Sequence, residues 1–233
     1  MMMDTNNSPQ LVDSEADLRE MGLVHRVAEP AGAGPYPTLV MLHGRYGDEN
    51  VMWLFRQAIP AHWLKIAPRG IVEGPSERFS WVPREDNIWP ELDQFDPAAD
   101  AVHKFLSSLS RVYNSDPQRL YLMGFSQGAA TAYAVAMRYP GLVQGIAGLV
   151  GFVPEGCEEM PCLSALQDVP IFAAAGKRDP LIPLERAQQS AAVLRRGGAK
   201  LMYREYDVGH KLNRQGMNDL RTWWQGIDRN PGG

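Results

Sequence analysis

The sequence predicts an α/β domain built on a doubly wound, mostly parallel sheet with helices on both faces. Three observations lead to this prediction. Apolar runs with strand propensity alternate with helical patterns, the connections between them are mostly short, and most of the runs are apolar throughout. A strand reads as a continuous apolar run when helices cover the sheet on both sides, as they do around parallel strands. Ligands of such sheets bind where the strands end.

Six segments have the composition of strands in this sheet. In chain order they are residues 38–42, 63–67, 120–123, 146–152, 170–175 and 201–206. The last of them alternates between polar and apolar residues, which favours a position at the edge of the sheet. Residues 24–27 are a candidate for a further, antiparallel edge strand.

Helical patterns separate these runs. They cover residues 97–113, 126–138, 183–196 and 213–227. Pro97 suits the first turn of its helix, where its missing N–H is not needed, and Gly197 with Gly198 suits a helix end. Residues 71–96 form a loop-rich stretch that holds three aromatic side chains of interest, Phe79, Trp81 and Trp89.

The composition is that of one globular domain. The chain has 233 residues, of which 45% are apolar and 21% charged, and its net charge is −4. We expect a flexible N-terminal tail over residues 1–20 and a single domain over residues 21–230. The sequence has no basic tract for a nucleic-acid partner, no apolar stretch as long as a membrane span, and no secretory-signal pattern at its start. We therefore expect a cytoplasmic protein.

Two cysteines, Cys157 and Cys162, lie in one loop rich in Gly, Pro and Glu. A cytoplasmic location predicts two reduced thiols, and a disulfide across the loop is the alternative. Because no histidine lies nearby, the pair does not read as a zinc site, and we expect no metal.

The most informative segment is residues 119–128. An apolar run leads into Gly124-Phe125-Ser126-Gln127-Gly128, and a helical pattern follows at once. This order predicts a strand, a very tight turn and a helix, with Ser126 at the turn. The glycines allow a strained backbone and close neighbours, so that the hydroxyl is open to a base on one side and a carbonyl carbon on the other. A glycine-rich turn that binds nothing, or binds a phosphate, is the alternative.

A serine needs a base, and the base needs an acid that orients it. Of the five histidines, only His210 follows Ser126, and it comes directly after the last predicted strand. Three aspartates lie between the two: Asp168, Asp179 and Asp207. Asp168 precedes its strand and so lies at the wrong end of the sheet. Asp179 follows a strand, and we favour it over Asp207, which could instead cap the last helix or pair with Arg204.

An oxyanion hole needs two backbone N–H groups. We expect one from Gln127, which follows the nucleophile, and one from Arg45, in the loop after the first core strand. His43 in that loop reads as a structural histidine rather than a second base. Asp48 and Glu49 read as anchors of the loop or as the start of the helix that follows.

These motifs together resemble the bacterial carboxylesterase/phospholipase family of the α/β-hydrolases, which also contains the acyl-protein thioesterases. The resemblance rests on Leu42 to Glu49, on the segment around Ser126, on Gly176 to Pro183 and on Gly209-His210, and it covers residues 36–227. It implies an esterase with little or no lid, without metal or organic cofactor, acting on short or medium acyl esters. Members often dimerise. Tyr46 departs from the family, which usually has a glycine or small residue there.

The sequence therefore predicts a serine carboxylesterase that cleaves small acyl esters with Ser126, His210 and Asp179. Candidate pocket residues are Tyr46, Phe79, Trp81, Phe152, Leu181 and Leu212. A lysophospholipase or acyl-protein thioesterase is the alternative within the class. A non-catalytic α/β-hydrolase that serves as ligand receptor or scaffold is the alternative outside it, and the intact set of site residues argues against it.

Overall fold

The fold centres on an eight-stranded sheet with strand order β1-β2-β4-β3-β7-β8-β9-β10. The computed structural model describes residues 8–83, 89–157 and 161–229. The strands are β1 Gln10–Val12, β2 His25–Ala28, β3 Tyr36–Leu42, β4 Leu64–Pro68, β7 Ser115–Phe125, β8 Ile146–Leu149, β9 Pro170–Gly176 and β10 Lys200–Tyr206. The neighbouring strands β4, β3, β7, β8, β9 and β10 pair in parallel, and β2 joins β4 antiparallel, so the predicted mostly parallel sheet is confirmed.

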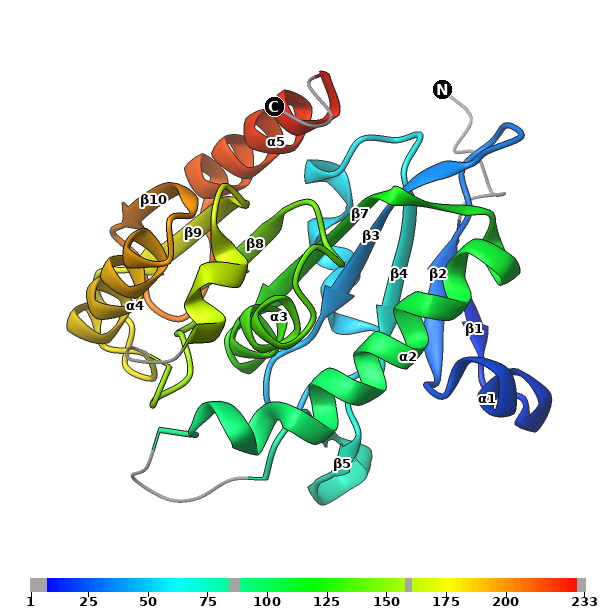
Figure 1. Ribbon diagram of the computed structural model, residues 1–233, viewed down its shortest axis with the longest axis horizontal. Helices are drawn as coiled ribbons and strands as arrows, with labels where there is room; N and C mark the ends of the chain where they lie inside the picture. The colour runs from blue at the N-terminus through cyan, green and yellow to red at the C-terminus, as the bar shows by residue number, and fades with distance from the viewer. Residues whose placement is uncertain (1–7, 84–88, 158–160, 230–233) are drawn as a thin grey trace.

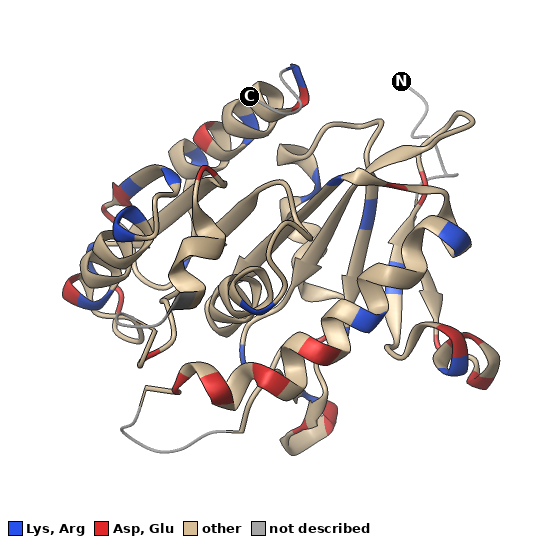
Figure 2. Ribbon diagram, in the orientation of Figure 1, with Lys and Arg blue, Asp and Glu red and all other residues tan. Residues whose placement is uncertain are grey.

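Helices cover the sheet on both faces (Figure 1). They are α1 Glu15–Met21, α2 Asp96–Tyr113, α3 Gln127–Arg138, α4 Leu184–Arg196 and α5 Arg214–Arg229, with 3₁₀ turns η1 Val51–Ala58, η2 Pro75–Glu77, η3 Leu92–Phe95 and η4 Pro161–Leu166. One buried cluster joins α1 to α4 with one face of the sheet, and a second joins η1 and α5 with the other. The charged side chains lie mainly on helices and loops, and the central strands carry few (Figure 2).

The beginning of the domain differs from the sequence prediction. Residues expected in a flexible tail form β1 and α1 instead. The side chain of Ser14 caps α1 by accepting the backbone N–H of Asp17, and Gly22 ends the helix in the left-handed conformation. Met21 is buried in the core. A strand of three residues and a helix of two turns are too short to produce a clear periodic pattern.

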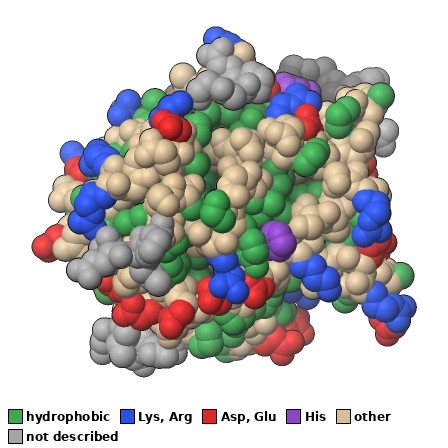
Figure 3. Space-filling model, viewed as in Figure 1, with side chains coloured by type: hydrophobic (Ala, Val, Ile, Leu, Met, Phe, Trp, Pro, Cys, Tyr) green, Lys and Arg blue, Asp and Glu red, His purple; other side chains and the backbone are tan. Residues whose placement is uncertain are grey.

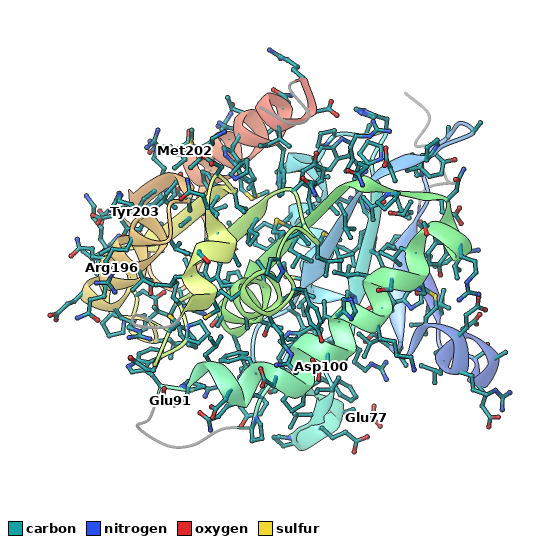
Figure 4. All side chains as sticks on the ribbon, in the orientation of Figure 1. Glu77, Glu91, Asp100, Arg196, Met202 and Tyr203 are labelled. Atoms are coloured by element: carbon teal, nitrogen blue, oxygen red, sulfur yellow. The ribbon has the colours of Figure 1, made fainter. Side chains whose placement is uncertain are left out.

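The predicted edge strand at residues 24–27 exists but is not at the edge. It is β2, and β1 pairs along its outer side. At the opposite end of the sheet, β10 is an edge strand as predicted, and Figure 4 labels two of its residues, Met202 and Tyr203. Within the described residues, none of the helices combines the length and the apolar character that a membrane span requires.

The loop-rich stretch before α2 contains a short hairpin of β5 Val72–Glu73 and β6 Phe79–Ser80. This hairpin lies against the loop that follows β3, where Phe79 forms an isolated bridge with Gly47. Strand β8 is shorter than predicted, because the chain leaves the sheet after Leu149. As a result, Phe152 sits beyond the carboxyl end of the strand and lines the cavity there.

Candidate active site

Strand β7 and helix α3 meet at Ser126 in a sharp turn. The serine has φ 55° and ψ −118°, a conformation that non-glycine residues adopt only when their surroundings enforce it. Its backbone N–H donates to the carbonyl of Leu149 on β8 at 2.9 Å, which anchors the turn to the sheet. The serine thus stands at the N-terminus of α3, where the helix dipole favours negative charge.

The two glycines of the turn have no room for a side chain. A Cβ at Gly124 would collide with the backbone carbonyl of Gly128, and a Cβ at Gly128 would collide with the carbonyl oxygens of Leu42 and His43. The start of α3 therefore packs directly on the end of β3. This close approach places Ser126 beside the loop that follows β3.

His210 and Asp179 form a partly buried hydrogen bond. Nδ1 of His210 lies 2.7 Å from Oδ2 of Asp179, whose side chain is only 1% exposed. The other carboxylate oxygen accepts the backbone N–H groups of Leu181 and Ile182 at 2.8 and 3.0 Å. With Nδ1 donating to the carboxylate, Nε2 of His210 is the atom that can accept a proton. The ring of Phe125 packs edge-on against the imidazole, with 5.1 Å between the ring centroids.

Among the described residues, the other two candidate acids form no hydrogen bond or ion pair with His210 and have other surroundings. Asp207 pairs with Arg178, and both side chains are well exposed. Its carboxylate at 2.8 Å and its carbonyl at 2.9 Å bind the same guanidinium, so the pair joins the loop of Asp179 to the loop of His210. Asp168 borders a different cavity, together with the first residues of β9 and β10, at the opposite end of the sheet.

The loop after β3 is held rigidly by His43. Nδ1 of His43 donates to the carbonyl of Gly44 at 2.7 Å, and Nε2 accepts the backbone N–H of Gly70 at 2.8 Å. Complete burial lowers the pKa of His43, which keeps the ring neutral, as these two bonds require. His43 therefore braces the loop, and both of its nitrogens are occupied.

The loop also carries Arg45, whose backbone N–H is one of the two expected oxyanion donors. Arg45 and Gln127 both line the cavity that contains Ser126. Within the part of the chain that the structure describes, neither of their backbone N–H groups has a hydrogen-bond acceptor. Two unpaired N–H groups beside a strained serine are suited to stabilising an oxyanion.

The cavity has a volume of about 690 Å³ and contains Ser126 and His210 together. The residues that line it, within the described part of the chain, are Gly44, Arg45, Tyr46, Pro83, Trp89, Pro90, Phe125, Ser126, Gln127, Phe152, Pro180, Leu181, Ile182 and His210. Of the predicted pocket residues, Tyr46, Phe152 and Leu181 are therefore placed in the lining. Tyr46 and Leu181 are 39% and 57% exposed, so they lie at the mouth, while Phe152 is buried in the wall.

The other three predicted pocket residues do not line this cavity. Trp81 is fully buried behind the loop that follows β3, with its indole donating to the carbonyl of His43 at 2.8 Å. Phe79 lies under the guanidinium of Arg69, and Leu212 packs against Gly216 of α5. Trp81 and Leu212 follow strand ends and Phe79 begins β6, but the three side chains turn toward the protein interior or a neighbouring loop.

Trp89 lines the cavity although it is not among the predicted pocket residues. Its ring meets that of Phe152 edge-on, with 4.8 Å between the centroids. The sequence shows several aromatic residues between positions 71 and 96, but only the folded chain brings Trp89 and Phe152 together.

Among the described residues, no group of three or more His, Cys, Asp or Glu side chains could hold a metal ion. Figure 3 shows one face of the molecule, where apolar and charged side chains are mixed.

The chain is similar to known hydrolases in sequence and in structure. Residues 25–226 match the family model described as phospholipase/carboxylesterase. MhqD of Bacillus subtilis strain 168, which is named as a hydrolase, is 25% identical over 188 residues, or 80% of this chain and 92% of that protein. Acyl-protein thioesterase 1 of Saccharomyces cerevisiae is 29% identical over 109 residues, or 41% of this chain and 48% of that protein.

Among solved structures, a carboxylesterase of Bacillus cereus matches with a TM-score of 0.79 at 19% sequence identity. The match covers 91% of this chain and 97% of that chain. The two proteins therefore share a fold over nearly their whole length.

Proposed function

As a member of the phospholipase/carboxylesterase family of α/β-hydrolases, the chain is a carboxylic ester hydrolase, and we propose that it is a serine carboxylesterase for short- to medium-chain acyl esters. The observation that carries this proposal is the 2.7 Å hydrogen bond between His210 and the buried Asp179, in a cavity that also contains Ser126. A nucleophile, a base and an orienting acid are the parts that acyl transfer needs.

The proposed reaction has two steps. Nε2 of His210 takes the proton of Ser126 while Oγ attacks the ester carbonyl, and the N–H groups of Arg45 and Gln127 stabilise the oxyanion. The imidazolium then protonates the leaving alcohol, which leaves an acyl-enzyme. Water repeats the sequence and frees the acid. Asp179 keeps its charge throughout and stabilises the imidazolium. This scheme requires neither a metal nor an organic cofactor.

The size of the cavity supports small ester substrates. Aromatic and proline side chains form much of its wall, and Leu181 and Tyr46 leave an apolar mouth. A volume of about 690 Å³ is within the usual range for a small-molecule site. Two alternatives stand within the class: acyl-protein thioesterase activity, for which a yeast relative is named, and lysophospholipase activity. A series of p-nitrophenyl esters separates them, since a short-chain optimum supports the simple esterase.

We also propose a cytoplasmic protein that acts on small molecules, with a homodimer as its assembly. Cys157 and Cys162 are thiols rather than a disulfide in this structure, a state that a reducing compartment favours. Light scattering after size-exclusion chromatography measures the assembly directly.

Labelling with a fluorophosphonate, followed by peptide mapping, tests the mechanism in wild type and Ser126→Ala. Stoichiometric modification of Ser126 that disappears in the variant is the expected result. A folded wild type without labelling would contradict an activated serine and favour the receptor or scaffold interpretation.

A further inference from the structure

Arg186, on the first turn of α4, is a nearly buried cation directly behind the wall of the active-site cavity. Its side chain is 11% exposed, although arginine is rarely buried without a specific role. It is absent from the cavity lining and from the proposed chemistry. Among the described residues, its side chain contacts the two segments that form the wall, at Trp89 in residues 89–92 and at Phe152, Val153 and Glu155 in residues 152–155.

The guanidinium packs on both aromatic rings of the wall. Its central carbon lies 5.1 Å from the ring centroid of Trp89 and 5.8 Å from that of Phe152. Nε of Arg186 is buried and has no hydrogen-bond partner among the described residues, so its surroundings are rings rather than acceptors. Cation–π attraction is strongest for tryptophan and grows when water is excluded, as it is here.

The same guanidinium also holds the backbone of the wall. One terminal nitrogen donates to the carbonyl of Val153 at 2.7 Å, and the other pairs with the carboxylate of Glu155. Ser190, one helical turn further along α4, accepts the N–H of Val153 at 2.9 Å. Helix α4 therefore binds both backbone polar groups of Val153.

The second wall segment is fastened to the first. The N–H of Glu155 donates to the carbonyl of Pro90, and the N–H of Leu92 donates to the carbonyl of Glu155, each at 3.0 Å. The two segments run parallel to each other there, at the bridge between Glu155 and Glu91. The side chain of Glu91 is labelled in Figure 4. A shift of Arg186 would thus reach Trp89 through the rings and through the backbone.

We propose that Arg186 is a positioning residue for substrate selection: it fixes the Trp89–Phe152 wall and so limits the length of the substrate chain that fits against it. This inference rests on the proposed esterase function. Arg186 does not touch the reacting atoms, and its effect passes through the two rings. If the wall is loosened, a substrate chain of the length that fills the rigid cavity no longer binds better than a longer one.

The experiment compares p-nitrophenyl acetate, butanoate and decanoate as substrates of wild type, Arg186→Met and Arg186→Lys. Methionine keeps much of the volume and removes the charge and the donors. We expect the ratio of kcat/KM for butanoate over decanoate to fall about fivefold in Arg186→Met, mainly through KM of butanoate. Lysine keeps the charge but not the planar fork, so an intermediate ratio is expected.

Arg138 offers a matched control. It also pairs with carboxylates, those of Asp96 and Asp100, and lies 5.8 Å from the ring centroid of Tyr139, but it is not in the cavity lining. Arg138→Met should leave the ester ratio at the wild-type value. The proposal is overturned if Arg186→Met changes all three esters by the same factor, or if Arg186→Lys keeps the wild-type ratio.

Fluorophosphonate labelling separates this proposal from the proposed function. If wild type and Arg186→Lys label at Ser126 while the ester ratio stays constant, only the role of Arg186 fails. If wild type itself does not label, the serine mechanism fails. Should Arg186→Met not fold, Arg186→Lys and Glu155→Gln decide: the glutamine variant keeps the bond to Val153 and the ring contacts, so it should select esters like wild type.

Discussion

The backbone N–H of Trp81 donates to Oε1 of Gln127 at 2.8 Å, which ties the loop after β6 to the first residue of α3. Through its indole N–H, Trp81 also holds the carbonyl of His43, two residues before Arg45. One buried residue therefore connects the two segments that carry the proposed oxyanion donors. Gln127 completes the link by donating from Nε2 to the carbonyl of Val82 at 3.2 Å.

Trp81→Phe removes the indole donor and keeps the backbone bond to Gln127. We expect kcat to fall about tenfold with little change in KM, because the loop of Arg45 loses its support while the cavity wall stays. Trp63→Phe is the control, since it also removes a buried indole bond, the one to Asp228 on α5. Steady-state kinetics on one ester measure both. Equal losses of kcat in the two variants would contradict a specific role for Trp81.

Asp179→Asn should lower kcat by about 10³- to 10⁴-fold, because an amide cannot hold the correct tautomer of His210 or stabilise its charge. Asp207→Asn should stay within about threefold of wild type, since its ion pair with Arg178 is exposed and screened by water. Rates for both variants decide between the two acids. A large loss in Asp207→Asn together with a small one in Asp179→Asn would reverse the assignment.

Two helical glycines should respond oppositely to replacement by alanine. At Gly128 the new methyl group would meet the backbone of β3, so we expect the folded protein to be lost or destabilised by more than about 4 kcal/mol. At Gly226 in α5, apart from the helix's own backbone and the two chain neighbours, none of the described atoms lies within 4 Å of the new atom. Gly226→Ala should raise the free energy of unfolding by about 0.5–1 kcal/mol, through the higher helix propensity of alanine. Urea unfolding measures both, and a destabilised Gly226→Ala would contradict this expectation.

Lys65 on β4 should cost stability at neutral pH. Its side chain is buried, its amine donates to the carbonyls of Ala61 and Trp63, and burial lowers its pKa to about 8. Between pH 8 and the ordinary value near 10.5, the unfolded chain binds more protons than the folded one, so the free energy of unfolding rises with pH. Below pH 8 this contribution is constant and unfavourable.

Lys65→Met should therefore raise the free energy of unfolding by about 1–3 kcal/mol at pH 7. The difference from wild type should shrink as the pH rises toward 10.5. Urea unfolding of both proteins at pH 7 and at pH 9.5 measures the slope. A difference that is the same at both values would mean that Lys65 does not titrate in the folded protein as its burial implies.

The strands and the turn at Ser126 were predictable from the sequence because each depends on residues that are adjacent in the chain. The run ending in Gly124 and the helix after Gly128 define a local pattern, and steric exclusion at both glycines enforces it. The contact of His210 with Asp179 also followed from position, since both come directly after parallel strands. The ends of such strands lie along one edge of a sheet.

The pocket could be predicted only in part, because side-chain direction in a loop depends on distant partners. Trp81 was expected in the lining, yet its indole turns to the carbonyl of His43. Trp89 became a wall residue through the pairing of Glu155 with Pro90 and Leu92. No periodic pattern in either segment predicts that pairing, because it joins two irregular segments that are far apart in the sequence.

Helix α4 has a consequence for how this enzyme could acquire new substrates. The helix begins directly after the turn in which Leu181 and Ile182 hold Asp179, and its first turns hold the cavity wall through Arg186 and Ser190. Moving the helix to widen the cavity would therefore displace the acid as well. Natural or laboratory evolution of a broader substrate range would have to proceed by exchanging side chains such as Trp89 and Phe152, while the helix stays where it is.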